Sequence, residues 1–192
     1  MSTVMLTSGG LDSTLMSVLA KELGQVTYPL FINYGQRSKN REWAACKNVH
    51  RNLGLPKPVK VDVAGIGKLI PCGLTDPSLD VYEDAFLPGR NLFFLLLGAS
   101  YAFKTNSDAV AIGLLNDKFS IFPDQTKEFI RLAETAIYQT LGRRITLVTP
   151  LMSFTKQEVI VLARKKGVSG TYSCHSGAEK PCRKCISCKE FQ

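Results

Sequence analysis

The sequence of 192 residues lacks several features that would assign it to a special class. Its longest apolar run, residues 92–103, contains Gly98 and Ser100 and is well short of the roughly 20 apolar residues that cross a bilayer. No basic segment followed by an apolar stretch and a small-residue cleavage site opens the chain. No internal repeat or low-complexity segment is visible. We therefore expect a cytoplasmic protein that has no membrane partner.

Blocks of five or six like charges are also missing, although the chain is basic. Twenty-four Lys and Arg residues stand against 16 Asp and Glu residues, a net charge of +8. The densest basic cluster, residues 164–166, closes an expected helix, where cations interact favourably with the helix dipole. A solvated basic face and a nucleic-acid patch both explain such a charge, because a positive field attracts any polyanion. The charge therefore does not require a nucleic-acid partner.

Length and composition predict one catalytic domain with an ordinary core. Apolar residues make up 45% of the chain and charged residues 21%, the balance of a globular protein. Strand-like and helix-like segments alternate, which is typical of an α/β fold with a doubly wound, mostly parallel sheet. We expect five strands, at residues 3–7, 26–32, 59–63, 109–113 and 145–148.

Helices are expected between these strands. The last one should begin with a capping box formed by Thr155 and Glu158. Residues 64–89 are rich in Pro, Gly and Asp, and we expect a loop there, over the carboxyl ends of the strands, as a candidate lid. Residues 1–170 would form the catalytic domain, and residues 171–192 a small metal-held segment. The expected helices cover residues 12–23, 41–53, 91–103, 124–141 and 155–166.

A phosphate-binding loop is expected directly after the first strand. Glycines let the backbone approach phosphate oxygens, successive amides can form an anion nest, and a helix N-terminus adds partial positive charge. The alternative is a tight strand-to-helix turn, capped by Asp12, that binds no ligand. The residues expected to bind nucleotide phosphates are Thr7, Ser8, Gly9, Gly10, Leu11, Asp12, Ser13 and Thr14.

The lysine of a Walker loop is missing from this segment, which indicates a different nucleotide chemistry. Residues 8–14 resemble the SGGxDS motif of PP-loop ATP pyrophosphatases, which have an adenine-nucleotide α-hydrolase-like fold and cut ATP between the α and β phosphates. The resemblance implies ATP and Mg²⁺ as cofactors. Asp12 is then a candidate catalytic residue that orients either the loop or the metal ion.

Cysteines crowd into the last part of the chain, with seven, two and two residues between successive cysteines. In a cytoplasmic protein this double C-x-x-C spacing favours thiolate zinc over disulfides, and four ligands complete a closed structural site. An iron–sulfur cluster is the alternative. His175 is a possible substitute ligand, while Cys46 and Cys72 have no partner at ligand spacing. The expected Zn²⁺ ligands are Cys174, Cys182, Cys185 and Cys188.

The combination of motifs resembles the 7-cyano-7-deazaguanine synthases of the queuosine pathway. Four stretches carry the resemblance over most of the chain: residues 8–14, the Asn-Tyr-Gly-Gln-Arg segment 33–37, the Leu-Pro-Gly-Arg-Asn segment 87–91, and Thr-Tyr-Ser-Cys at 171–174 with the later cysteines. Members of that family use ATP and ammonia to convert 7-carboxy-7-deazaguanine into its amide and then its nitrile, each through an adenylated oxygen. A homodimer is also implied.

The resemblance implies roles for several side chains. Arg90 can grip a carboxylate or phosphate with two hydrogen bonds, and Lys156 can approach the phosphates, so both join Asp12 as catalytic candidates. Tyr34 can stack on a purine-like ring. The alternative is that Tyr34 covers the sheet edge and Arg37 is solvated. The residues expected to bind the substrate are Tyr34, Gln36, Arg37, Arg90, Asn91 and Asp124.

One segment departs from the family pattern. Gln125 and Thr126 stand where the family has a cysteine and an arginine, and the sequence between Cys182 and Cys185 lacks the usual glycine. The adenylation step is therefore predicted more firmly than the final product. A divergent paralogue that joins the activated carboxylate to another amine, such as one on a protein, is one alternative. A PP-loop tRNA-modifying enzyme and a non-catalytic nucleotide-binding module are the others.

Overall fold

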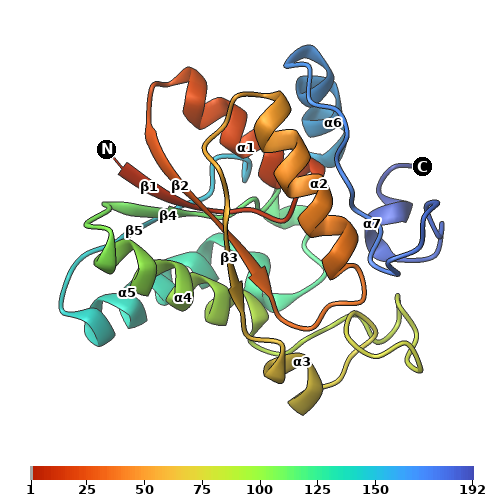
Figure 1. The fold of residues 1–192 in the computed structure, drawn as a ribbon. Helices are drawn as coiled ribbons and strands as arrows, with labels where there is room; N and C mark the ends of the chain where they lie inside the picture. The colour runs from red at the N-terminus through yellow and green to blue at the C-terminus, as the bar shows by residue number, and fades with distance from the viewer. Residues whose placement is uncertain (1) are drawn as a thin grey trace.

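The computed structural model of the chain describes residues 2–192. Its centre is a sheet of five strands in the order β3-β2-β1-β4-β5, in which every neighbouring pair is parallel (Figure 1). The expected doubly wound α/β fold is thus confirmed. The strands are β1 (Ser2–Leu6), β2 (Val26–Asn33), β3 (Val59–Asp62), β4 (Ala109–Ala111) and β5 (Thr146–Val148).

Helices cover both faces of this sheet. Helices α1, α2 and α6 lie on one face and α4 and α5 on the other (Figure 1). Within residues 2–192, none of the helices combines the length and apolar character that a bilayer span requires. The helices are α1 (Leu11–Glu22), α2 (Lys39–Asn52), α3 (Gly65–Leu69), α4 (Arg90–Lys104), α5 (Lys127–Leu141), α6 (Lys156–Lys165) and α7 (Ile186–Lys189).

The central strand β1 contributes to two apolar cores because successive side chains of a strand point to opposite faces. Val4 and Leu6 belong to the core under α4 and α5. Met5 packs with Leu15 of α1 and Val159 of α6 in the other core. Full burial of one such side chain stabilises the fold by about 1.5–3 kcal/mol. The buried strand therefore fixes the position at which the loop after it leaves the sheet.

Some element boundaries differ from those expected. The helix expected at 124–141 begins at Lys127, because Thr126 is extended and its side chain caps the helix by accepting a hydrogen bond from the Phe129 amide at 3.1 Å. Pro123–Gln125 forms a separate 3₁₀ turn before it. The loop expected at 64–89 contains the short helix α3. Strand β4 ends earlier than expected, at Ala111.

The strand order reverses between β1 and β4, which lie side by side at the centre of the sheet. In open parallel sheets, ligands bind beyond the carboxyl ends of the strands at such a switch point. The loops that follow β1, β2 and β4 meet at this edge. The fold thus places the glycine-rich loop where a ligand site is expected.

Gly9 fixes the loop after β1 against helix α2. A Cβ atom at this position would lie 2.5 Å from the Cys46 amide nitrogen and 2.6 Å from the Glu42 carbonyl oxygen. The φ angle of Gly9 is +78°, in the left-handed region that disfavours side chains. Only glycine therefore allows this close approach of two backbones.

The substitution Gly9→Ala should destabilise the protein more than Gly24→Ala. Gly24 has a similar φ of +66° but no atom within 4 Å of its Cβ position, so alanine there costs about 1–2 kcal/mol for the left-handed backbone alone. The clash at Gly9 should add about 1–3 kcal/mol. Urea unfolding of both variants measures the difference, and equal losses would contradict the packing argument.

Candidate active site

The loop after β1 is held in shape by its own serines. The Ser8 amide donates to the Ser13 hydroxyl at 3.1 Å, and the Gly10 amide donates to the Ser8 hydroxyl at 3.2 Å. Gly10 precedes helix α1, and no side chain in the described part of the chain caps this helix. Its first amides are therefore available to an anion. The loop has the geometry of a phosphate cradle.

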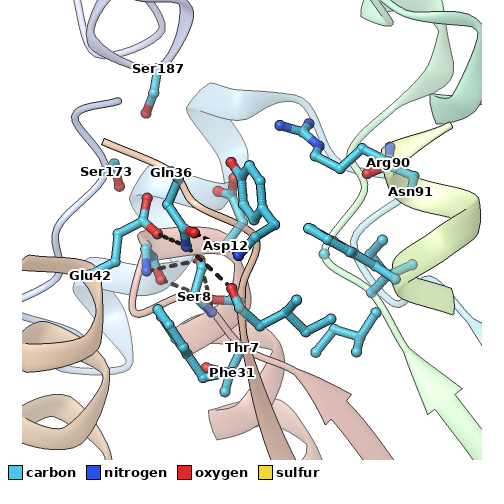
Figure 2. A pocket seen from close by; sticks show the side chains of 18 of the residues that line it. Thr7, Ser8, Asp12, Phe31, Gln36, Glu42, Arg90, Asn91, Ser173 and Ser187 are labelled. Atoms are coloured by element: carbon cyan, nitrogen blue, oxygen red, sulfur yellow. Dashed lines mark hydrogen bonds between the residues drawn. The ribbon is translucent and has the colours of Figure 1, made fainter. Parts of the chain in front are cut away.

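This loop forms one wall of a cavity of about 260 Å³. The other walls come from the ends of β2 and β4, the beginning of α4 and the C-terminal segment. Figure 2 shows Gln36 and Glu42 on one side of the cavity and Arg90 and Asn91 on the other. Residues that are far apart in the sequence thus face one cavity.

Most of the predicted phosphate-binding residues line this cavity. Gly9 does not, because it faces helix α2, and Thr14 does not, because its side chain is fully buried behind the loop. The hydroxyl of Thr7 lies 3.3 Å from Nε2 of His50. The predicted residues that line the cavity are Thr7, Ser8, Gly10, Leu11, Asp12 and Ser13.

Tyr34, Arg90 and Asn91, three of the residues expected to bind the substrate, also line the cavity. The Arg90 guanidinium lies 6.0 Å from the centre of the Tyr34 ring, within the range of a cation–π contact. Burial raises the pKa of Tyr34 to about 12, so this phenol stays neutral. The Asn91 side chain donates to the Asp124 carbonyl oxygen at 2.9 Å. These groups form an aromatic and cationic wall.

Besides Asn91, three more of the predicted substrate-binding side chains bond to the protein itself. Arg37 donates to the Gly73 carbonyl oxygen at 3.1 Å, and the Asp124 carboxylate accepts from the Asn91 amide at 3.2 Å. Neither Arg37 nor Asp124 lines the cavity. Gln36 does line it, but its amide oxygen accepts from the Tyr34 amide. These three residues position their neighbours.

Asp12 is paired with Lys156 across the edge of the cavity. The Lys156 ammonium nitrogen lies 2.9 Å from each carboxylate oxygen of Asp12 and 3.0 Å from Glu190. Burial lowers the pKa of Lys156, but the two carboxylates outweigh it and the net shift is upward. A lysine at the start of a helix is disfavoured by the helix dipole, and these carboxylates compensate. The pair places a cation beside the loop that follows β1.

A second cavity of about 570 Å³ adjoins the first. Asp12, Gly113 and Leu114 line both cavities, and Lys156 lines the second. Gln125, one of the two residues that depart from the family pattern, also lines the second cavity. The Asp12 carboxylate therefore lies at the boundary between two adjacent binding spaces.

Glu42 is a cavity residue that the sequence analysis missed. It lies on helix α2 and is only 9% exposed. Glu42, Cys46 and Val49 are buried and recur at helical spacing, so the sequence did carry a signal for this residue. A carboxylate on an otherwise buried helix face is the unusual feature.

The four C-terminal cysteines come together as predicted. Their sulfur atoms lie within 4.8 Å of one another, and those of Cys182 and Cys188 are 3.9 Å apart. A tetrahedral zinc ion with Zn–S bonds of about 2.3 Å requires sulfur separations of roughly 3.8 Å. Burial raises the pKa of Cys182, but the amides of Cys185 and Lys184 donate to its sulfur and lower that pKa to about 6. The cluster suits a thiolate-bound zinc ion.

The cysteine segment also forms part of the cavity wall. The Tyr172 amide donates to the Gly9 carbonyl oxygen at 2.9 Å, which joins the segment directly to the loop after β1. Ser173, His175 and Ser187 line the cavity. A metal ion in the cluster would therefore stabilise one side of the candidate site.

The family of the chain follows from sequence comparison. A family model described as "Queuosine biosynthesis protein QueC" matches residues 2–191. The chain belongs to the QueC family. The 7-cyano-7-deazaguanine synthase of Aliarcobacter butzleri is 34% identical over 194 residues, which cover 95% of this chain and 85% of that protein. The 7-cyano-7-deazaguanine synthase of Methanosphaerula palustris is 30% identical, and the match covers 98% of this chain and 91% of that protein. These relatives are named as synthases, and this QueC-family chain is an enzyme.

Solved structures show the same fold at lower identity. A predicted subunit of tRNA methyltransferase from Methanocaldococcus jannaschii matches 85% of this QueC-family chain and 76% of its own, with 23% identity and a TM-score of 0.58. The match to the NMN synthetase of Francisella tularensis covers 93% of this chain and 67% of that chain, with 13% identity and a TM-score of 0.55. At these identities the likeness concerns the fold alone.

Loss of one cluster cysteine should release bound zinc and destabilise the protein. The substitution Cys185→Ser removes a fully buried cysteine of the cluster, whereas the control Cys72→Ser changes a buried cysteine outside the cluster. We expect Cys185→Ser to cost at least about 2 kcal/mol, which lowers Tm by roughly 4–8 °C. Elemental analysis and thermal melts measure both effects. Full zinc content in Cys185→Ser would contradict the ligand assignment.

Proposed function

We propose that this enzyme is an ATP-dependent carbon–nitrogen ligase that converts 7-carboxy-7-deazaguanine into 7-cyano-7-deazaguanine. The carboxylate oxygen attacks the α-phosphorus of ATP and pyrophosphate leaves; ammonia then displaces AMP to give the amide. A second ATP activates the amide oxygen in the same way, and loss of AMP and protons gives the nitrile. The observation that carries the proposal is the single cavity that joins the phosphate cradle to Arg90 and Asn91.

In this proposal, different residues contact the phosphates, the carboxylate and the ring of the ligands. Amides and hydroxyls of Ser8 and Ser13 bind phosphate oxygens, and Lys156 stabilises the charge of the departing pyrophosphate. Arg90 holds the substrate carboxylate for attack. The Asp12 carboxylate offers the hard oxygen ligand that Mg²⁺ takes, and an ion held there would neutralise phosphate charge. Tyr34 provides a flat surface for the heterocycle.

The four-cysteine segment binds structural Zn²⁺ in this proposal, and the enzyme forms a homodimer, which light scattering tests. Ammonia is the proposed nitrogen donor. Thr126 caps α5, and the Gln125 amide oxygen accepts from the Ile121 and Phe122 amides, so both departures from the family pattern bond to the local backbone. These contacts do not identify the amine that follows the proposed adenylation.

The activity is tested by incubating the protein with ATP, Mg²⁺, ammonia and 7-carboxy-7-deazaguanine. We expect AMP, pyrophosphate and the amide or nitrile, which mass spectrometry identifies. AMP without either product would point to another amine, such as one on a protein, as the acceptor. Release of AMP stimulated by tRNA alone would contradict the small-molecule substrate.

The substitution Lys156→Gln should reduce AMP formation by about 10²–10³-fold, because it removes the cation beside the phosphate cradle. The matched control is Lys166→Gln, whose lysine pairs with Glu22 at 2.6 Å on the surface. An exposed ion pair contributes about 0–1 kcal/mol to stability, so the control should retain its activity. Initial rates of AMP release measure both. Equal rates in the two variants would remove Lys156 from the mechanism.

A further inference from the structure

Glu42 presents a buried carboxylate to the first cavity. Its two oxygens accept hydrogen bonds from the Ser38 hydroxyl at 2.6 Å and from the Gln36 side-chain amide at 3.0 Å. Gln36 is itself fixed, because its amide nitrogen also donates to the Ile32 carbonyl oxygen and its amide oxygen accepts from the Tyr34 amide. The carboxylate is therefore held in one orientation by its neighbours.

The charge of this carboxylate has no cationic partner in the described residues. Among residues 2–192, no Lys, Arg or His side chain lies within ion-pair distance of Glu42. Burial raises its pKa, against the hydrogen bonds from Ser38 and Gln36 and the more distant charge of Arg90. Each carboxylate oxygen can accept a further hydrogen bond, so donors from a bound ligand would complete the site. A buried acid that faces a cavity in this way is a candidate for ligand recognition.

The cavity has an acceptor on one side and a cation on the other. Figure 2 shows Glu42 on the side of helix α2, Arg90 on the opposite side at the start of α4, and Asp12 between them. The ring of Tyr34 also lines the space. The complementary ligand is flat, carries hydrogen-bond donors on one edge and an anion at the opposite end.

We propose that Glu42 determines substrate specificity by accepting hydrogen bonds from the ring N–H and the 2-amino group of a 7-deazaguanine, while Arg90 holds its carboxylate. The assignment rests on the proposed function. A carboxylate has only acceptors, and the guanine-type edge offers two adjacent donors. The adenine edge of ATP offers a donor beside an acceptor, so it pairs with two acceptor oxygens less well than the guanine-type edge does. Glu42 thus binds the deazaguanine acid and not the adenine of the nucleotide.

The test compares 7-carboxy-7-deazaguanine with the analogue that lacks only the 2-amino group. For the unmodified protein, we expect kcat/KM of AMP formation to be about 10- to 150-fold lower with the analogue, the effect of losing a hydrogen bond to a charged group. In Glu42→Gln the ratio of kcat/KM between the parent acid and the analogue should fall close to unity, because the 2-amino group no longer donates to a charged carboxylate. Discrimination between ATP and purine riboside triphosphate, which lacks the 6-amino group, should not change.

The outcomes separate this inference from the proposed function. If the unmodified protein converted the parent acid and the analogue at equal kcat/KM, the proposed role of Glu42 would be wrong. This measurement needs no variant. If Glu42→Gln changed only the discrimination between ATP and purine riboside triphosphate, Glu42 would contact the nucleotide and not the acid. Absence of turnover with the parent acid would overturn the proposed function and this assignment with it. Thermal melts and zinc content exclude misfolding, and Glu128→Gln, on the exposed side of α5, is the matched control.

Discussion

The arrangement of the site depends on the close contact that Gly9 makes on two sides. Its backbone lies against Glu42 and Cys46 of α2, where no side chain fits, and its carbonyl oxygen accepts from the Tyr172 amide. One residue thereby connects the phosphate cradle, the helix that carries Glu42 and the segment that carries the cysteines. A shift of the loop would move all three walls of the cavity. The requirement for glycine at this position is therefore structural, because it comes from packing against α2.

Lys156 provides a second connection between the same parts. Its ammonium group bonds to Asp12 in the loop and to Glu190 beyond the cysteine cluster, and it lies 5.0 Å from the Phe191 ring. The cation is thus oriented from both ends of the chain. This gives a metal ion in the cluster an indirect role, because it would fix Glu190, which holds Lys156 over the loop. The C-terminal segment is part of the site wall and more than an appendage.

The sequence predicted the features that are local in the chain. The Ser8–Ser13 loop, the capping box of Thr155 and the cysteine spacing each depend on neighbouring residues, and the structure confirms these arrangements. The direction of a side chain was harder to predict, because it depends on packing between distant elements. Arg37 carries a charge that suits a ligand but donates to the Gly73 carbonyl oxygen. Glu42 lies on α2, which packs on Gly9, and it lines the cavity.

The two cavities limit how the proposed reaction can be arranged. A space of about 260 Å³ is smaller than the roughly 300–1,000 Å³ of usual ligand sites. The second, of about 570 Å³, shares Asp12, Gly113 and Leu114 with it. For an acid held between Glu42 and Arg90, the proposed reaction would place the nucleotide across the wall that the two cavities share. The attacked phosphorus then lies near Asp12, where Lys156 can stabilise the leaving pyrophosphate.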